Sequence, residues 1–212
     1  MKITNFATHH AGGMQANPFA FTQNQTWQDI DNAHKERWPE FKSSLGYWGG
    51  YNVFIAKNGS WKQFRKIGEE TAAVKGHNQD TFSTCLAGNF NLGKEGWLIE
   101  SPTPDQVKTL TMFEERALDG TLGQILEMVP GTEVDIKFGN IGPHRQWGST
   151  DCFGTSLKDD WARELVRPHL EKKIGLLSKI IAIYLQILDI LRGQKTKLGG
   201  ARPISCLDDA RG

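Results

Sequence analysis

The sequence changes character at Pro168. Before this residue, short stretches with the two-residue periodicity of strands alternate with stretches of helical periodicity, which indicates a domain of the α/β or α+β class. After it, apolar residues recur in alternating steps of four and three from Leu170 to Leu191, a sustained heptad pattern. We therefore predict a domain over residues 1–166, an amphipathic helix over 167–193 and a flexible tail over 194–212.

Local signals predict the elements of the first domain. Thr26 and Thr103 are expected to cap helices, and Pro104 at the first helical position strengthens the second helix start. Asn58 and Gly59 form a signal for a two-residue hairpin turn. Pro168 is expected to interrupt the helix that begins after Gly154. We expect helices at 27–38, 104–114 and 122–128, and strands at 2–8, 51–57, 60–67, 82–87 and 134–138.

Composition, charge and cysteine count limit what the chain can be. Hydrophobic residues make up 38% of the chain, which is enough for a core. The 25 Lys and Arg residues are balanced by 24 Asp and Glu residues, so there is no electrostatic footprint for nucleic acid. The three cysteines, Cys85, Cys152 and Cys206, are odd in number and widely spaced, which speaks against a disulfide framework. The first residues lack the continuous apolar segment of a secretory signal, so we expect synthesis in the cytoplasm without a signal peptide.

Three residues have the chemistry of a zinc site. His9 follows the first expected strand, and His144 and Cys152 lie eight residues apart in a loop rich in glycine. Zinc binds imidazole nitrogen and thiolate sulfur, and catalytic zinc sites use three protein ligands. The spacing by itself favours a simpler interpretation, in which His144 is an ordinary loop histidine and Cys152 a small buried residue.

Four blocks of the sequence resemble, in the same order, the amidase family that includes the phage lysozyme-type amidases and the peptidoglycan-recognition proteins. The blocks are 8–13 (THHAGG), 34–38 (HKERW) with 50–59 (GYNVFIAKNG), 76–77 (GH) with 85–90 (CLAGNF), and 144–152 (HRQWGSTDC). The resemblance covers residues 3–166 and implies an α/β fold with a mixed central β-sheet flanked by helices. The heptad segment would then be an appended C-terminal amphipathic helix.

The resemblance also implies roles for individual residues. It makes His9, His144 and Cys152 the ligands of one Zn²⁺ ion per chain. His10 is then a packed or hydrogen-bonded neighbour, because adjacent residues of a strand point to opposite faces. If the strand register differs by one residue, His9 and His10 exchange these roles.

Three further residues match functional positions of the family. Tyr51 lies where these amidases place a tyrosine beside the metal, and Thr150 lies where they have lysine or threonine, so both are candidate catalytic residues. His77 resembles a histidine of the cleft that contacts substrate. Each also has a structural interpretation: Tyr51 as a strand tyrosine, Thr150 as a residue that shapes a turn, and His77 as a loop histidine. Ala11 and Asn52 depart from the family pattern, which puts substrate contacts in doubt more than chemistry.

The function implied is zinc-dependent hydrolysis of the amide bond between N-acetylmuramic acid and L-alanine in peptidoglycan. The absent signal peptide suggests a phage or prophage endolysin that reaches the cell wall by phage-mediated release. The alternatives are a non-catalytic module that binds peptidoglycan and a cytoplasmic amidase that recycles muropeptides. For the heptad segment 170–191 we rank homo-oligomerisation first, ahead of packing on the amidase domain and of peripheral membrane contact. Lys179, Gln186 and Asp189 speak against a helix that spans a membrane.

Overall fold

The computed structural model describes residues 1–12, 25–91 and 100–198, with side chains as far as residue 191. The chain separates into two compact units, residues 1–168 and 169–212. Cys206 and residues 199–212 of the expected tail lie outside the described residues.

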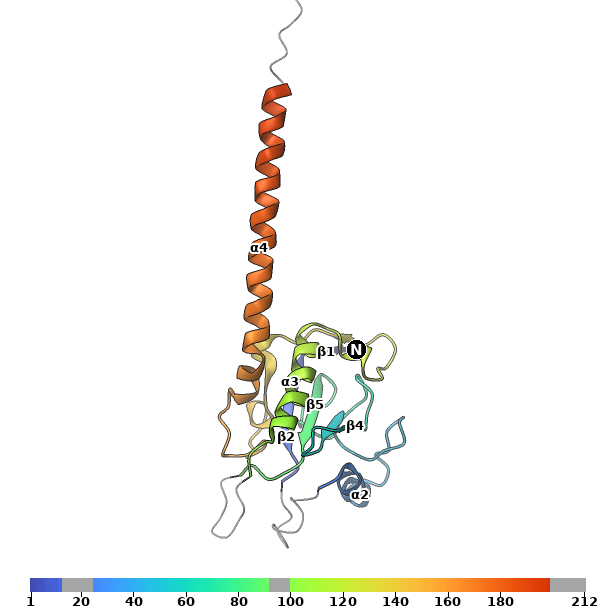
Figure 1. Cartoon of the computed structure of the whole chain (residues 1–212). Helices are drawn as coiled ribbons and strands as arrows, with labels where there is room; N and C mark the ends of the chain where they lie inside the picture. The colour runs from blue at the N-terminus through green and yellow to red at the C-terminus, as the bar shows by residue number, and fades with distance from the viewer. Residues whose placement is uncertain (13–24, 92–99, 199–212) are drawn as a thin grey trace, which may run out of the picture. The chain divides into compact units, whose positions relative to one another are not determined.

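A five-stranded sheet forms the centre of the first unit (Figure 1). Its strands run in the order β4-β3-β5-β2-β7, and β4 alone is antiparallel to its neighbour, so the sheet is mixed as expected. A separate pair joins β1 to β6 in parallel. The strands are β1 Lys2–Ile3, β2 Asn5–His10, β3 Val53–Ile55, β4 Trp61–Gln63, β5 Thr81–Leu86, β6 Glu133–Val134 and β7 Ile141–Pro143.

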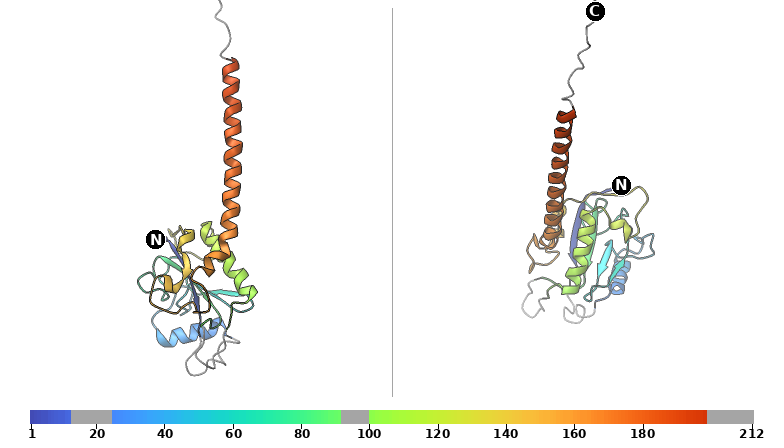
Figure 2. Two further views of the ribbon diagram at one scale, coloured as in Figure 1. Left: turned by 90° about the vertical axis from the view of Figure 1, so that its left-hand side faces the viewer. Right: turned by 45° about the horizontal axis from the view of Figure 1, so that its top comes forward.

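Helices α2 (Trp27–Arg37) and α3 (Pro104–Leu118) cover different sides of this sheet (Figure 2). The larger core cluster joins alternate strand residues such as Phe6 and Phe82 to Leu110 and Phe113 of α3. A smaller cluster joins Ile30 of α2 to the opposite side of β3 and β5. The two-residue alternation of β2 therefore sends Phe6 toward α3, and it sends Ala7 and His9 toward the other side.

The predicted caps and the predicted hairpin are confirmed, but the turn is longer than the two residues expected, because the N–H of Ala56 donates to the carbonyl of Ser60 and three residues lie between them. Thr26 and Thr103 each accept a hydrogen bond from the third helical residue, whose side chain accepts one in return from the cap backbone. The turn between β3 and β4 contains Asn58 and Gly59, and Gly59 has a φ of +77° that favours glycine. The buried strand expected at 82–87 is β5, in the middle of the sheet.

Two predicted elements are wrong. The helix expected at 122–128 is only a 3-10 turn at Leu122–Gln124, because residues 127–129 extend and exchange backbone hydrogen bonds with Ile67. The strand expected at 134–138 ends at Val134, and the last strand of the central sheet is β7. Glycine and proline in β7 suggested a loop, but Pro143 lies at the end of an edge strand, where a missing N–H is tolerated.

Pro168 does not interrupt its helix, contrary to the prediction. Helix α4 runs from Trp161 to Leu198 with Pro168 inside it. Ala162 and Val166 are buried in the core of the first unit, so packing holds the helix before the proline. By length and composition, the part of α4 as far as Leu191 is sufficient to cross a membrane.

Candidate metal centre

The register of two parallel strands brings the first two candidate ligands together. Thr8 of β2 lies opposite Pro143 of β7, so the next residues, His9 and His144, are also neighbours. Their ring centroids are 4.6 Å apart. His10 points to the other face of the sheet, where its Nδ1 accepts a hydrogen bond of 2.9 Å from the backbone N–H of Phe90. This register places His9, and not His10, beside His144.

Arg145 holds the loop that carries the third candidate ligand. Its backbone N–H donates to the carbonyl of Cys152 at 3.0 Å, and its guanidinium donates to the carbonyls of Gly154 and Leu157. The same guanidinium forms an ion pair with Asp159. These contacts fold the loop back on itself, which returns Cys152 to the end of β2.

His9, His144 and Cys152 form one compact group. Their potential ligand atoms all lie within 4.8 Å of one another, and Cys152 Sγ is 3.6 Å from His9 Nδ1. Burial lowers the pKa of His9 well below its usual value, and the adjacent His144 lowers it further. Burial also lowers the pKa of His144 and raises that of the Cys152 thiol to about 12.

The group fits a zinc ion. His9 Nε2 is buried and has no hydrogen-bond partner among the described residues, which is costly for a polar atom. Neutral imidazoles and a cysteine sulfur are the donors that zinc prefers, and three of them leave one position open. Three such ligand atoms, all within 4.8 Å of one another, fit a single Zn²⁺ ion.

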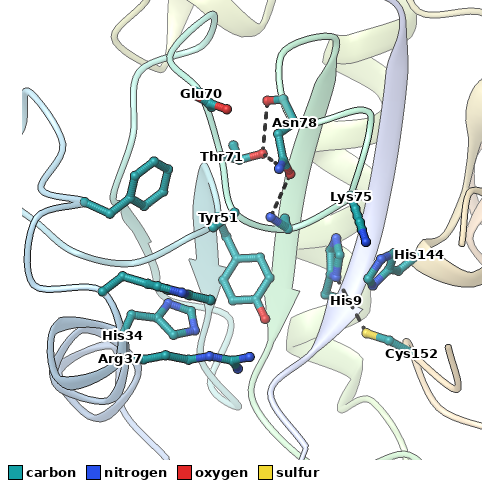
Figure 3. A pocket seen from close by; sticks show the side chains of 14 residues that line it. His9, His34, Arg37, Tyr51, Glu70, Thr71, Lys75, Asn78, His144 and Cys152 are labelled. Atoms are coloured by element: carbon teal, nitrogen blue, oxygen red, sulfur yellow. Dashed lines mark hydrogen bonds between the residues drawn. The ribbon is translucent and has the colours of Figure 1, made fainter.

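The group lies in the wall of a cavity of about 610 Å³ (Figure 3). The cavity is bounded by the end of β2, helix α2, the segment before β3 and the loop that precedes β5. Its lining residues are His9, His34, Arg37, Trp38, Phe41, Tyr51, Glu70, Thr71, Ala72, Ala73, Lys75, Asn78, His144 and Cys152.

Tyr51 lies between the metal group and helix α2 (Figure 3). Its ring centroid is 5.0 Å from that of His9 and 5.5 Å from that of His34. Burial, and then the neighbouring thiols of Cys85 and Cys152, raise the pKa of Tyr51 well above its usual value. The phenol therefore stays protonated at neutral pH and is able to donate a hydrogen bond.

His34 is a residue of the cavity that the sequence analysis did not assign to the site. Its Nδ1 accepts a hydrogen bond of 2.8 Å from the backbone N–H of Gly50, and burial lowers its pKa to about 4. A neutral imidazole that accepts at Nδ1 carries its hydrogen on Nε2. The signal in the sequence was its position on the same helical face as Ile30 and Trp38.

A buried arginine fixes three segments around the cavity, and nothing in its sequence context indicated this role. Arg65 is only 2% exposed. Its guanidinium donates to the backbone carbonyls of Gly49, Glu70 and Phe41. Asn78 acts similarly at the opposite wall, where its Oδ1 accepts hydrogen bonds from the backbone N–H groups of Ala73 and Val74.

Two predicted site residues lie elsewhere. Thr150 is not among the lining residues, and its hydroxyl accepts a hydrogen bond of 3.2 Å from the backbone N–H of Cys152. His77 is also not among them, and its Nδ1 lies 3.3 Å from a carboxylate oxygen of Asp80. The loop that carries His77 instead contributes Lys75 and Asn78 to the cavity. Cys85 is a buried free thiol of β5, as expected.

No protein-family model and no curated protein matches the chain. Among solved structures, Drosophila PGRP-LB superposes with a TM-score of 0.50 and 17% identity, over 79% of this chain and 82% of its own. The N-acetylmuramoyl-L-alanine amidase LysC from Clostridium intestinale URNW has a TM-score of 0.49 and 22% identity, over 77% and 83%. The Ph2119 endolysin from the Thermus scotoductus MAT2119 bacteriophage has a TM-score of 0.47 and 16% identity, over 78% and 85%. The similarity to PGRP-LB shows the fold that the sequence resemblance implied.

Proposed function

We propose that the chain is a zinc-dependent amidase that hydrolyses the bond between N-acetylmuramic acid and L-alanine in peptidoglycan. The observation that carries this proposal is the group of His9, His144 and Cys152, which lies in the wall of an open cavity. The shared fold with PGRP-LB and the four sequence blocks support the same substrate class.

Hydrolysis of this amide requires three things: activation of water, stabilisation of an oxyanion and a proton for the leaving nitrogen. A zinc ion held by the His9, His144 and Cys152 group would supply Lewis acidity and lower the pKa of water to near 7. Water adds its oxygen to the lactyl carbonyl carbon, the C–N bond breaks, and a proton of that water passes to the leaving nitrogen of L-alanine. The protein's part is to place the amide beside this group.

Tyr51 is the side chain best placed to stabilise the oxyanion. It stays protonated, it lines the cavity, and its ring lies 5.0 Å from that of His9. A hydrogen bond from a fixed phenol to an oxygen that becomes negative strengthens as the charge develops. Thr150 is a positioning residue in this account, because its hydroxyl holds the backbone of Cys152.

The opposite side of the cavity suits the substrate's polar and acidic groups. Nε2–H of His34 provides a neutral donor, and Arg37 and Lys75 provide positive charge at the rim. We propose that these residues bind oxygen atoms of the muramic acid and carboxylates of the stem peptide. The expected route to the wall, release by a phage from the cytoplasm, is part of the same proposal.

The test is digestion of purified sacculi, with separate measurement of binding and of products. We expect release of stem peptides with free L-alanine amino termini, and retention of intact glycan strands. Binding to sacculi without release of peptides would instead identify a recognition module. Cleavage of small soluble muropeptides but not of sacculi would identify a recycling amidase.

A further inference from the structure

The second unit contains a long helical stretch whose apolar side chains are exposed. Between Ile174 and Leu191, eleven large hydrophobic residues are each at least 49% exposed. Only two residues of this stretch are charged, Lys179 and Asp189. Exposure of this much contiguous apolar surface to water is unfavourable, so the helix needs a partner of some kind.

The apolar side chains form two adjacent stripes, whose centres are about 100° apart, and together these stripes cover most of the circumference of the helix. Successive residues of an α-helix are rotated by about 100°. Ile181 lies on the heptad seam, whereas Ile183 lies about 200° away on the second apolar stripe. The second stripe consists of Leu176, Ile180, Ile183, Ile187 and Ile190.

The remaining narrow face gathers the polar and small residues. It consists of Gly175, Ser178, Lys179, Ala182, Gln186 and Asp189. The hydroxyl of Ser178 donates a hydrogen bond of 3.0 Å to the carbonyl of Ile174, so its polarity is satisfied within the helix. Lys179, Gln186 and Asp189, which interrupt the apolar pattern in the sequence, are thus confined to one face.

A coiled-coil dimer would cover only part of this apolar surface. Its seam uses two positions in seven, so the seam through Ile181 would be buried and the stripe through Ile183 would remain in water. A helix that is apolar over most of its circumference is suited to the core of a large protein or to a membrane. Lipid is the partner that covers both stripes together.

Length and charge also match a bilayer. The 18 residues from Ile174 to Leu191 extend about 27 Å, close to the hydrocarbon thickness of about 30 Å. Asp189 lies within one turn of the end of the stretch, and the long stem of Lys179 can carry its charge toward the nearer interface. Basic residues flank the stretch on both sides, at Lys172 and Lys173 before it and at Arg192, Lys195 and Lys197 after it. These cations complement anionic lipid headgroups.

We propose that residues 174–191 cross a lipid bilayer once, with anionic lipid as the preferred partner. This assignment replaces the heptad-mediated homo-oligomer that the sequence favoured. It rests on the second unit alone and does not depend on amidase activity. The narrow polar face leaves room for contacts between copies within the membrane, but insertion does not require them.

The full chain is synthesised in the presence of vesicles of phosphatidylglycerol and phosphatidylethanolamine, and then floated after a high-salt wash. The variants are Ile181→Glu on the seam and Ile183→Glu on the second stripe, with Ile181→Val and Ile183→Val as matched controls. We expect wild type and both valine variants to float. The vesicle-bound fraction of each glutamate variant should be at least about tenfold lower than that of wild type, because a charge on either stripe meets hydrocarbon. Failure of wild type to float would indicate a coiled coil in water and overturn the proposal. Retention of Ile183→Glu with loss of Ile181→Glu would also overturn it, because a helix with only its seam in lipid lies on the surface.

Trypsin added outside intact vesicles tests whether the helix spans the bilayer. A spanning helix protects the bonds after Arg192, Lys195 and Lys197, so mass spectrometry finds a fragment that continues to Gly212. The bonds become cleavable when detergent is added. A fragment that ends at Arg192 without detergent would show a helix lying on the surface, which contradicts a span.

Discussion

At the scale of single residues, Tyr51 connects the metal group to the rest of the cavity. Its ring lies between those of His9 and His34, and its hydroxyl stays protonated because burial raises its pKa. Tyr47 is a natural comparison, because it packs against Trp27 and Phe64 and is not among the residues that line the cavity. The two tyrosines separate the effect of a phenol in the site from that of a phenol in the core.

We predict that Tyr51→Phe lowers kcat by about 10²-fold, the usual effect of removing one oxyanion donor. KM and bound zinc should change little, since the ring and the ligands remain. Tyr47→Phe serves as the control and should keep its full rate. Equal kcat values for wild type and Tyr51→Phe in sacculus digestion would remove Tyr51 from the chemistry.

Glu114 is a buried acid that the proposed mechanism does not use. It is 0% exposed, and neither carboxyl oxygen has a hydrogen-bond partner among the described residues. Burial, and then the adjacent Glu115, raise its pKa well above the usual value. Because the pKa of Glu114 is raised in the folded state, the neutral acid contributes its full share of the folding stability below about pH 4.5, the ordinary pKa of this group. This stability is lost as the pH rises through the folded pKa.

Glu114→Met is therefore predicted to stabilise the protein at pH 7, by roughly 1–3 kcal/mol, which is the usual cost of an unsatisfied buried group. The advantage over wild type should shrink as the pH falls toward 4.5. Denaturant unfolding at several pH values measures both effects. Glu36→Met, at an exposed position of α2, is the control. A destabilised Glu114→Met at pH 7 would show that the acid has a favourable partner.

Residue identity alone could predict only part of this site. His9, His144 and Cys152 were found because their types and order match a known family. Arg65 could not be found, because its role depends on three carbonyls from segments 16, 24 and 5 residues away. His77 matched a family motif, yet the fold places it outside the cavity lining, since its loop presents Lys75 and Asn78 instead.

At the scale of elements, helix α3 links its own cap to the sheet. Thr103 accepts a hydrogen bond from the backbone N–H of Gln106 and donates one of 2.5 Å to the carbonyl of Lys57 beside the hairpin. Gln106 donates to the carbonyls of Ile55 and Ala87, at the ends of β3 and β5. The capping box was predictable from four adjacent residues, but these tertiary contacts were not.

Thr103→Ala is predicted to cost more stability than Thr26→Ala. Loss of a cap costs about 1 kcal/mol at either helix. Thr103→Ala also leaves the carbonyl of Lys57 without this donor, which adds roughly another 1 kcal/mol. Thermal or denaturant unfolding of the two variants measures the difference, and Thr103→Ser should recover most of it. Equal losses at the two caps would show that the contact with Lys57 contributes nothing.

At the scale of the whole molecule, local sequence patterns predicted individual elements, but they did not predict which distant strands pair. Helices α2 and α3, the hairpin and β5 follow from caps, turns and periodicity. Strand β7 was missed, because Gly142 and Pro143 have low strand propensity and their pairing with β2 is set 135 residues away in the chain. That pairing places His144 beside His9, so the strand pairing on which the metal group depends could not be predicted from the local sequence.

The most direct test of the account is zinc content measured together with sacculus digestion, in wild type and in Cys152→Ala. Cys206→Ala, which removes the cysteine outside the described residues, controls for zinc bound to any free thiol. We predict about one zinc per chain in wild type and in Cys206→Ala, with release of stem peptides that begin at L-alanine. Cys152→Ala should lose both the zinc and the release. Stoichiometric zinc in Cys152→Ala, or release of peptides from metal-free wild type, would contradict the proposed metal centre.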